Sequence, residues 1–478
     1  MFVWEKRIII FVEKKRKTMK KTILVCLMVA CSLLTFAQKA YRYRVELKDK
    51  AGTAYSVDRP QDFLSGRAIE RRNRQQLPIE ETDLPVSGIY IKEMTGMGAR
   101  LVTTSKWNNT VVLEVSDTTL MDKIKGLSCV TEVKKVWTQP DSIPPRNKNR
   151  KKEVTNDVRK AGYHYGKAFR QINIHGGDSL HAVGFTGKGM HVAVIDAGFY
   201  NADKIKFFKK MDLLGIRDFV NPESDIYAEN SHGMKVLSCM AAYTEDAFVG
   251  TAPDASYWLL RTEDQDTEQP IEEDYWASAI EFADSAGVDV VNTSLGYYKF
   301  DEGYPAYRYR DLDGHYSLMS HSASMAADKG IVVVCSAGNS GADAWKKVTP
   351  PGDSENVLTV GALTKSLENA DFSSVGNTSD GRIKPDVMAI GVNSVVSGND
   401  GMVSKANGTS FASPIMCGIV TCFWQACPWL TAKEVIDAVR QAGDRADFPD
   451  NIYGYGVPNL WEAYKNLIHH RVAQSYTE

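Results

Sequence analysis

Four residues of this 478-residue chain have side chains that could cooperate in acyl transfer. A serine hydroxyl is a poor nucleophile at its ordinary pKa, so it needs a neighbouring base and a group that orients the base. An amide that donates to a developing oxyanion stabilises the transition state more than the substrate. The hydroxyl, imidazole, carboxylate and amide that fit these roles belong to Ser410, His232, Asp196 and Asn339.

Ser410 lies in the run GTSFASP (residues 408–414), and the residues that follow, up to Trp429, are uncharged and mostly apolar. This pattern predicts a buried helix. The free N–H groups and the positive dipole at the start of such a helix favour negative charge on the serine oxygen. We expect Pro414 in the first helical turn, where no N–H group is needed.

The other three residues stand at the ends of elements that could hold them rigidly. Asp196 ends the apolar run HVAVID, and Asn339 follows the similar run IVVVCS (residues 331–336). Such runs predict parallel strands covered on both faces, whose carboxyl ends gather functional groups. His232 opens a stretch of small and apolar residues, which predicts a helix capped by Ser231. Each residue alone is explained by a turn or a cap, but together they favour a site.

On these motifs the chain resembles the subtilisin-like serine proteases. The serine segment, the A-G-N ending at Asn339 and the chain order Asp, His, Ser match that family. Chymotrypsin-like and α/β-hydrolase enzymes use other orders. The chain departs from the family at Ala197, which replaces the Ser or Thr of D-[ST]-G, and at Met234, which replaces the Thr of H-G-T. The resemblance spans about residues 165–467.

The resemblance implies a role for each site residue. Ser410 would be the nucleophile, His232 the general base, Asp196 the orienting acid and Asn339 an oxyanion donor beside the Ser410 N–H. The segment VDVVNTSLG (residues 288–296) resembles the strand whose edge pairs with extended peptide in this family. The substrate-binding residues that we expect are Ser294, Leu295, Gly296 and Gly338.

Two folded domains are expected. Residues 166–470 predict a three-layer α/β, subtilisin-like domain with a mainly parallel sheet. Its expected strands are 191–196, 257–262, 288–293 and 331–336. Residues 38–140 show a β-α-β-β-α-β order, which favours a small α+β ferredoxin-like unit. In subtilisin relatives such a unit is a propeptide that inhibits its own enzyme, so it is the expected intramolecular partner of a zymogen.

The flanking segments indicate export and processing. Residues 1–37 have the pattern of a signal peptide region, with the true start expected at Met19: two lysines and a short apolar core end at Ala37. Residues 141–165 are basic and marked by prolines, as in a linker, and form an expected processing site. We therefore expect an exported protein, located in the periplasm, at the cell surface or outside the cell.

Composition gives no other partner. The net charge of −2 gives no bias towards nucleic acid. The uncharged stretch 407–432 is long enough to span a bilayer, but its polar residues favour a buried helix, so no membrane span is expected in the mature chain. No cofactor or metal is required. The acidic run 263–274 predicts a solvated loop and helix start, with a structural calcium site or a subsite for basic residues as the alternative.

These observations predict a secreted serine endopeptidase that cleaves peptide substrates through an acyl-enzyme. Two alternatives stay open. One is an acyl-transfer variant on the same fold, a transpeptidase or cyclase, which a water-excluding cover over Ser410 would favour. The other is an inactive peptide-binding protein on the same fold, which the departures at Ala197 and Met234 suggest and the four intact chemical positions oppose.

Overall fold

The structure, a computed structural model, describes residues 39–142 and 164–475. The larger unit is built on a seven-stranded parallel sheet in the order β13-β12-β11-β10-β5-β9-β6. Apolar runs form its central strands because helices cover both faces. The strands are β5 (His191–Asp196), β6 (Asp212–Asp218), β9 (Ser256–Arg261), β10 (Val290–Thr293), β11 (Val332–Ser336), β12 (Leu358–Leu363) and β13 (Val387–Ile390).

The expected fold class is confirmed. The four strands expected from the sequence are present with small shifts at their ends; β10, for example, begins at Val290 rather than at residue 288. The expectation missed β6, β12 and β13. β6 lies at the sheet edge and exposes most of its side chains, so it lacks the apolar run that marks the central strands.

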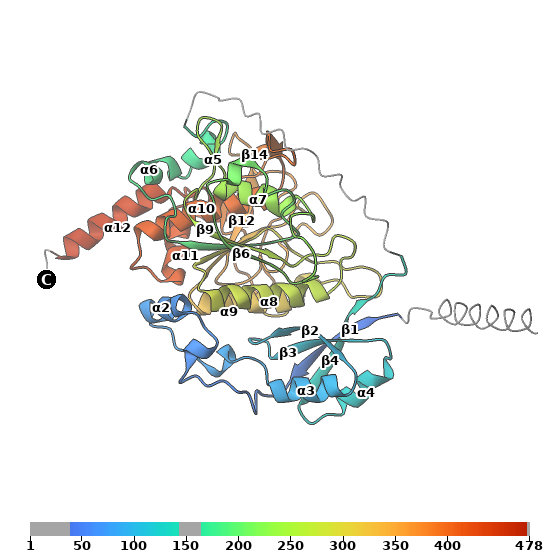
Figure 1. The fold of residues 1–478 in the computed structure, drawn as a ribbon. Helices are drawn as coiled ribbons and strands as arrows, with labels where there is room; N and C mark the ends of the chain where they lie inside the picture. Colours follow the sequence, from blue (N-terminus) through green and yellow to red (C-terminus); the bar gives the residue numbers. More distant parts are fainter. Residues whose placement is uncertain (1–38, 143–163, 476–478) are drawn as a thin grey trace, which may run out of the picture.

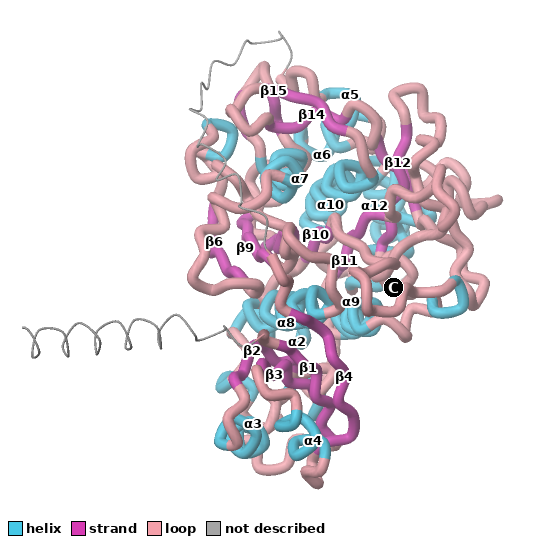
Figure 2. The backbone as a smooth tube through the Cα atoms, turned by 90° about the vertical axis from the view of Figure 1, so that its right-hand side faces the viewer, coloured by secondary structure: helices cyan, strands magenta, loops and turns pink. Residues whose placement is uncertain are grey.

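Helices form the two outer layers. α7 (His232–Ala241) and α10 (Thr409–Ala426) pack on one face of the sheet, and α8 (Ile271–Ala286) and α9 (Leu318–Asp328) pack on the other (Figures 1 and 2). α10 is buried along almost its whole length, as its apolar sequence predicts. The remaining α-helices and strands are α5 (Phe169–Asn173), α6 (Gly177–Ala182), α11 (Ala432–Gln441), α12 (Leu460–Ser475), and the short pairs β7 (Tyr243–Thr244) with β8 (Phe248–Val249) and β14 (Ser394–Ser397) with β15 (Val403–Ala406).

The N-terminal unit has the expected ferredoxin-like order. Its antiparallel sheet runs β2-β3-β1-β4. One face of this sheet contacts α8 of the larger unit, and below it in Figure 1 lie α3 and α4. The elements are β1 (Tyr41–Leu47), α2 (Gly66–Arg74), α3 (Gly88–Gly96), β2 (Arg100–Ser105), β3 (Thr110–Val115), α4 (Thr119–Lys125) and β4 (Val130–Thr138).

Some expectations fall outside the described residues. The signal peptide region 1–37, the start at Met19 and most of the linker 141–165 belong to this group. Within residues 39–142 and 164–475, no helix combines the length and the apolar content needed to cross a bilayer.

Candidate active site

Asp196 and His232 meet at the carboxyl end of the parallel sheet. Asp196 is the last residue of β5 and is fully buried, whereas His232 is the first residue of α7. Asp196 Oδ1 accepts hydrogen bonds from His232 Nδ1 at 2.7 Å and from the N–H of Ala197 at 2.8 Å. Gly233 permits this close packing, since a Cβ there would lie 2.8 Å from the Cβ of Asp196. The contact orients the imidazole and leaves its Nε2 for another partner.

The charge of Asp196 controls the protonation of His232. Burial lowers the pKa of the imidazole, but the carboxylate of Asp196, with a smaller contribution from Glu263, outweighs burial and raises this pKa above its ordinary value. Asp196 Oδ2 is buried without a hydrogen-bond partner in the described part of the chain. This agrees with the missing hydroxyl at Ala197, where most subtilisin-like sequences have Ser or Thr.

Ser410 lies in the first turn of α10. Its Oγ donates a long hydrogen bond of 3.4 Å to the carbonyl of Ser294. The expectation for Pro414 was wrong: α10 begins at Thr409, so the proline lies beyond the first turn and cannot donate to the carbonyl of Ser410. That carbonyl instead accepts a hydrogen bond of 2.8 Å from Ser294 Oγ. The strand-edge residue Ser294 therefore replaces the bond that the proline removes.

Asn339 stands in the loop after β11 with its amide oriented. Its Oδ1 accepts hydrogen bonds from the N–H and the Oγ1 of Thr409, at 2.9 and 3.0 Å. Because these bonds fix the oxygen, the Nδ2 group stays available as a donor. The residue before Ser410 thus fixes the orientation of the amide.

A cleft of about 480 Å³ joins these groups. His232, Ser410 and Asn339 line the cleft. Asp196 does not line it but is hydrogen-bonded to His232, which does. All four expected substrate-binding residues line the same cleft, namely Ser294, Leu295, Gly296 and Gly338. Tyr298 adds an aromatic wall and stacks on Trp345, with ring centroids 4.8 Å apart.

The acidic run 263–274 is not the solvated loop that the sequence suggested. Glu272, Glu273 and Asp274 are at most 2% exposed. Glu263 lines the cleft beside His232, and its pKa is raised to about 8, first by burial and then by Asp196 and Glu268. A subsite for basic residues was the alternative that the sequence left open for this run, and of its residues Glu263, two positions after β9, lines the cleft.

The carboxylates of this run serve different neighbours. Asp274 pairs with Arg44 at 2.6 Å, and Glu273 accepts hydrogen bonds from Tyr307 and Ser317. In the part of the chain that the structure describes, no group of three or more His, Cys, Asp or Glu side chains has the geometry to hold a metal ion.

A parallel three-layer domain with this cleft is the arrangement of a serine hydrolase. The model of the subtilase family, peptidase S8, matches residues 187–456, more than half of the chain. The chain therefore belongs to the subtilase family and carries a serine peptidase domain. The Bacteroidota type of the peptidase S8 propeptide domain matches residues 42–155.

Named relatives agree with this assignment. The chain is 32% identical over 304 residues to serine protease AprX of Bacillus subtilis strain 168. The matched region covers 57% of this chain and 66% of AprX. It is 30% identical over 281 residues to subtilisin NAT of Bacillus subtilis subsp. natto, covering 58% and 66%. With subtilisin DY of Bacillus licheniformis it shares 29% over 289 residues, covering 59% and 93%. The chain thus spans slightly less than two thirds of the first two relatives.

Proposed function

We propose that the chain is an exported serine endopeptidase that hydrolyses peptide bonds through an acyl-enzyme on Asp196, His232 and Ser410. The observation that carries the proposal is the 2.7 Å bond between Asp196 and His232 beside a cleft that His232 shares with Ser410 and Asn339. The chain belongs to a family of serine peptidases, which supports peptide-bond hydrolysis as the reaction class. The finer roles below follow from the geometry and from general chemistry.

Ser410 Oγ attacks the scissile carbonyl carbon, and His232 Nε2 takes the hydroxyl proton as the C–O bond forms. The resulting imidazolium is stabilised by the buried carboxylate of Asp196. His232 then gives the proton to the leaving amine as the C–N bond breaks, which leaves an ester on Ser410. A water molecule, deprotonated by the same imidazole, releases the new carboxylate and restores Ser410.

Charge on the tetrahedral oxygen is stabilised by two donors, the Ser410 N–H and the Asn339 amide. Thr409 holds the oxygen of that amide, so the donor is already oriented before substrate arrives. Preorganised donors of this kind need no rearrangement during the reaction, and they stabilise the transition state more than the ground state.

The substrate is an extended peptide that lies along Ser294, Leu295 and Gly296 in the cleft that Gly338 also lines. Main-chain hydrogen bonds to such an edge give affinity that is independent of sequence, and the pockets beside it select side chains. We assign residues 38–140 as the prodomain, 141–165 as the linker and 166–470 as the catalytic domain; the propeptide match over residues 42–155 supports the prodomain and extends into the assigned linker. We further propose that the prodomain is an intramolecular inhibitor.

The reaction is tested by digestion of an unfolded protein in isotopically heavy water, with and without an added amine. Hydrolysis by the wild type incorporates heavy oxygen into each new carboxyl terminus, and mass spectrometry detects it. Ser410→Ala abolishes the products. The control Ser366→Ala changes an exposed serine that does not line the cleft, and it leaves the products unchanged. Products that carry the amine instead of heavy oxygen would indicate an acyl-transfer enzyme, and no products from either chain would refute the peptidase assignment.

A further inference from the structure

Glu263 is the one acidic residue among the described residues that line the active-site cleft, and the reaction proposed above does not use it. The cleft also has one lysine, Lys235 of α7. No ion pair joins these two side chains, and the carboxyl group of Glu263 makes no hydrogen bond within residues 39–142 and 164–475. A carboxyl group without a partner in a binding cleft is open to a group of the substrate.

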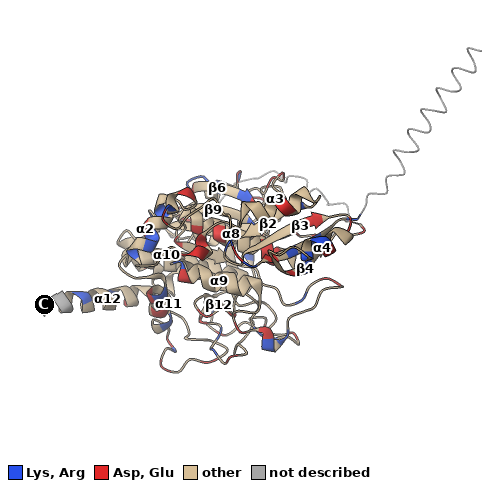
Figure 3. Ribbon diagram, turned by 90° about the horizontal axis from the view of Figure 1, so that it is seen from below, with Lys and Arg blue, Asp and Glu red and all other residues tan. Residues whose placement is uncertain are grey.

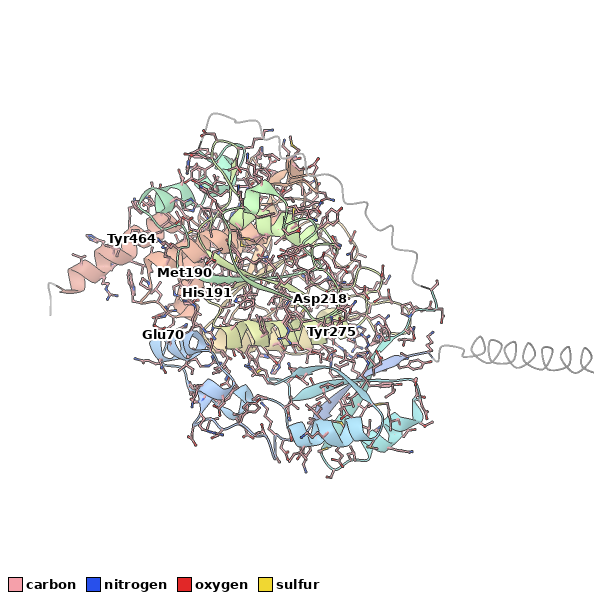
Figure 4. All side chains as sticks on the ribbon, in the orientation of Figure 1. Glu70, Met190, His191, Asp218, Tyr275 and Tyr464 are labelled. Atoms are coloured by element: carbon pink, nitrogen blue, oxygen red, sulfur yellow. The ribbon has the colours of Figure 1, made fainter. Side chains whose placement is uncertain are left out.

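The end of β9 places Glu263 beside the catalytic pair. β9 pairs in parallel register with β5 as far as Asp196, and the N–H of Thr262 then donates to the carbonyl of Asp196 at 3.1 Å. In Figure 4, His191 and Asp218 mark the two ends of the sheet, because they begin β5 and end β6. Glu263 follows at the carboxyl end, where the functional groups of open parallel sheets gather.

The arginine that precedes Glu263 by two residues binds another carboxylate. The guanidinium of Arg261 donates to Asp218 at 2.8 Å. Arg261 lowers the pKa of Glu263, but burial, Asp196 and Glu268 raise this pKa more, to about 8. The protein therefore leaves the carboxyl group of Glu263 without a cation bound to it.

Two further carboxyl groups form an acidic cluster with Glu263, and neither is part of an ion pair in the described part of the chain. Glu272 of α8 is fully buried; its Oε1 accepts a hydrogen bond from the N–H of Asp264 at 2.6 Å, and its Oε2 has no partner among the described residues. Burial raises the pKa of Glu268 to about 7. Burial also raises the pKa of Glu272, and Glu263 and Glu268 add to this effect.

Other buried acids of α8 are paired with cations. Figure 3 shows the acidic residues of this helix in red. Asp274 pairs with Arg44, and Asp284 pairs with three basic side chains. A buried carboxylate is stable when a cation lies beside it. The acidic cluster has no such cation, and its member Glu263 lines the cleft, so a substrate can supply the missing charge.

Tyr297 connects the acidic cluster to the expected substrate edge. It follows Gly296, is 1% exposed, and has a hydroxyl group without a hydrogen-bond partner among the described residues. After burial, Glu272 and Glu263 raise the pKa of this hydroxyl most, so their carboxyl groups lie close to it. The cluster and the edge along which a peptide would extend are therefore neighbours.

We propose that Glu263 is a specificity-determining residue of the cleft, whose carboxylate binds the ammonium or guanidinium group of a lysine or arginine near the scissile bond. The proposal rests on the peptide cleavage proposed above and names the side chain that the cleft prefers. Charge-assisted hydrogen bonds would join the two groups. The apolar stem of the substrate side chain would lie in the cleft that Leu295 and Phe411 also line.

The preference should depend on pH, because Glu263 must be ionised to bind a cation. The charged groups that face it are Asp196 of β5, Arg261 of β9, His232 and Lys235 of α7, and Glu268 and Glu272 of the acidic cluster. With a pKa of about 8, the carboxyl group of Glu263 gains its charge as the pH rises from 6 to 9. A lysine of the substrate stays charged over this range, so the preference for lysine should grow with pH.

The test begins with digestion of a peptide library by the full wild-type chain, and mass spectrometry locates the cuts. Lysine and arginine should be enriched at one position near the cut. Two peptides with lysine or methionine at that position, which are similar in length and differ in charge, then give a ratio of kcat/KM. At pH 9 this ratio should be about 10 to 100 for the wild type and near 1 for Glu263→Gln. Glu263→Lys should instead enrich aspartate and glutamate.

The matched control is Asp264→Asn, since Asp264 belongs to the same loop but does not line the cleft. This change should leave the ratio at its wild-type value. Between pH 6 and 9 the ratio should rise less in Glu263→Gln than in the wild type, because the variant keeps the other titrating neighbours. Equal ratios for the wild type and Glu263→Gln, with both peptides cleaved, would overturn the subsite. Absence of any cleavage by the wild type would overturn the peptidase proposal and the subsite with it.

Discussion

Two buried aspartates of the catalytic domain have opposite surroundings. Asp196, beside the cleft, binds one titratable side chain, His232, and its Oδ2 has no hydrogen-bond partner among the described residues. Asp284, at the domain boundary, binds Arg71, Arg72 and Lys106. Both aspartates are fully buried. Burial alone therefore does not distinguish the site of chemistry from the site of assembly.

The difference lies in the partners. An arginine keeps its charge at all relevant pH values, so the network around Asp284 cannot exchange protons and serves to hold two domains. The imidazole of His232 changes charge near neutral pH, and its side chain is 30% exposed towards the cleft. A buried acid with one titratable partner can support proton transfer, whereas a buried acid with several permanent cations stabilises an interface.

The largest predicted effect is at the first aspartate. Asp196→Asn keeps the shape of the side chain but removes the charge and favours the wrong imidazole tautomer, so kcat for peptide hydrolysis should fall by about 10⁴-fold. Thermal unfolding should change little, because this aspartate makes few hydrogen bonds. Steady-state kinetics and calorimetry on the same preparation measure both; a kcat within tenfold of the wild type would contradict the role of Asp196.

The reciprocal change is Asp284→Asn. It leaves Arg71 and Arg72 buried with one charge partner fewer, which should reduce the free energy of unfolding by about 3–5 kcal/mol. The kcat of the folded fraction should stay unchanged, because Asp284 does not line the cleft. Denaturant titration followed by active-site counting separates the two quantities. A loss of kcat without a loss of stability would end the distinction between the two aspartates.

A smaller effect is expected at the oxyanion donor. Asn339→Ala removes an amide that acts mainly in the transition state, so kcat should fall by about 100- to 1000-fold while KM changes little. This range is the one known for the corresponding amide of subtilisin, which belongs to the same family. Thr409→Val offers a graded test, since it removes the Oγ1 donor to Asn339 but keeps the backbone bond. A rise in KM with unchanged kcat for Asn339→Ala would assign this residue to ground-state binding.

The smallest effect concerns pH. His232 must be neutral to act as a base, and its pKa is raised, so kcat/KM should fall as the pH drops through a value above the ordinary histidine pKa of 6.5. Because the pKa of Glu263 is raised to about 8, this carboxyl is mostly neutral where His232 titrates, so Glu263→Gln should move the acidic limb to lower pH only slightly. Asp264→Asn is the neighbouring control. A downward shift of the acidic limb by about one unit or more in Glu263→Gln would contradict this, because it would require Glu263 to be ionised beside His232.

The cleft residues were more predictable than the interface residues. Asp196, His232, Ser410 and Asn339 each follow or open an element with a strong apolar pattern, so local sequence indicated where each would lie. By contrast, Arg71 lies on a short charged helix, and its partner Asp284 is 213 residues away. A local sequence pattern indicates the element to which a residue belongs, but it does not indicate the distant group that buries the residue. In the sequence, a buried arginine on a charged helix therefore cannot be distinguished from an arginine exposed to solvent.

The same limit explains two smaller errors. Pro414 was expected in the first turn of its helix because the sequence does not show that Ser294 supplies a hydrogen bond to the carbonyl of Ser410. Glu272 and its neighbours were expected in solvent because charge normally indicates exposure. In both cases a contact between distant segments outweighed the local preference.

The most direct test of the central claim is to locate the covalent adduct formed with a fluorophosphonate. Peptide mapping of the treated wild type by mass spectrometry should place one phosphonyl group on Ser410, and the adduct should form far more slowly in His232→Ala, whose serine lacks its base. An adduct on another residue, or labelling of Ser410 at an equal rate without the imidazole, would contradict the account.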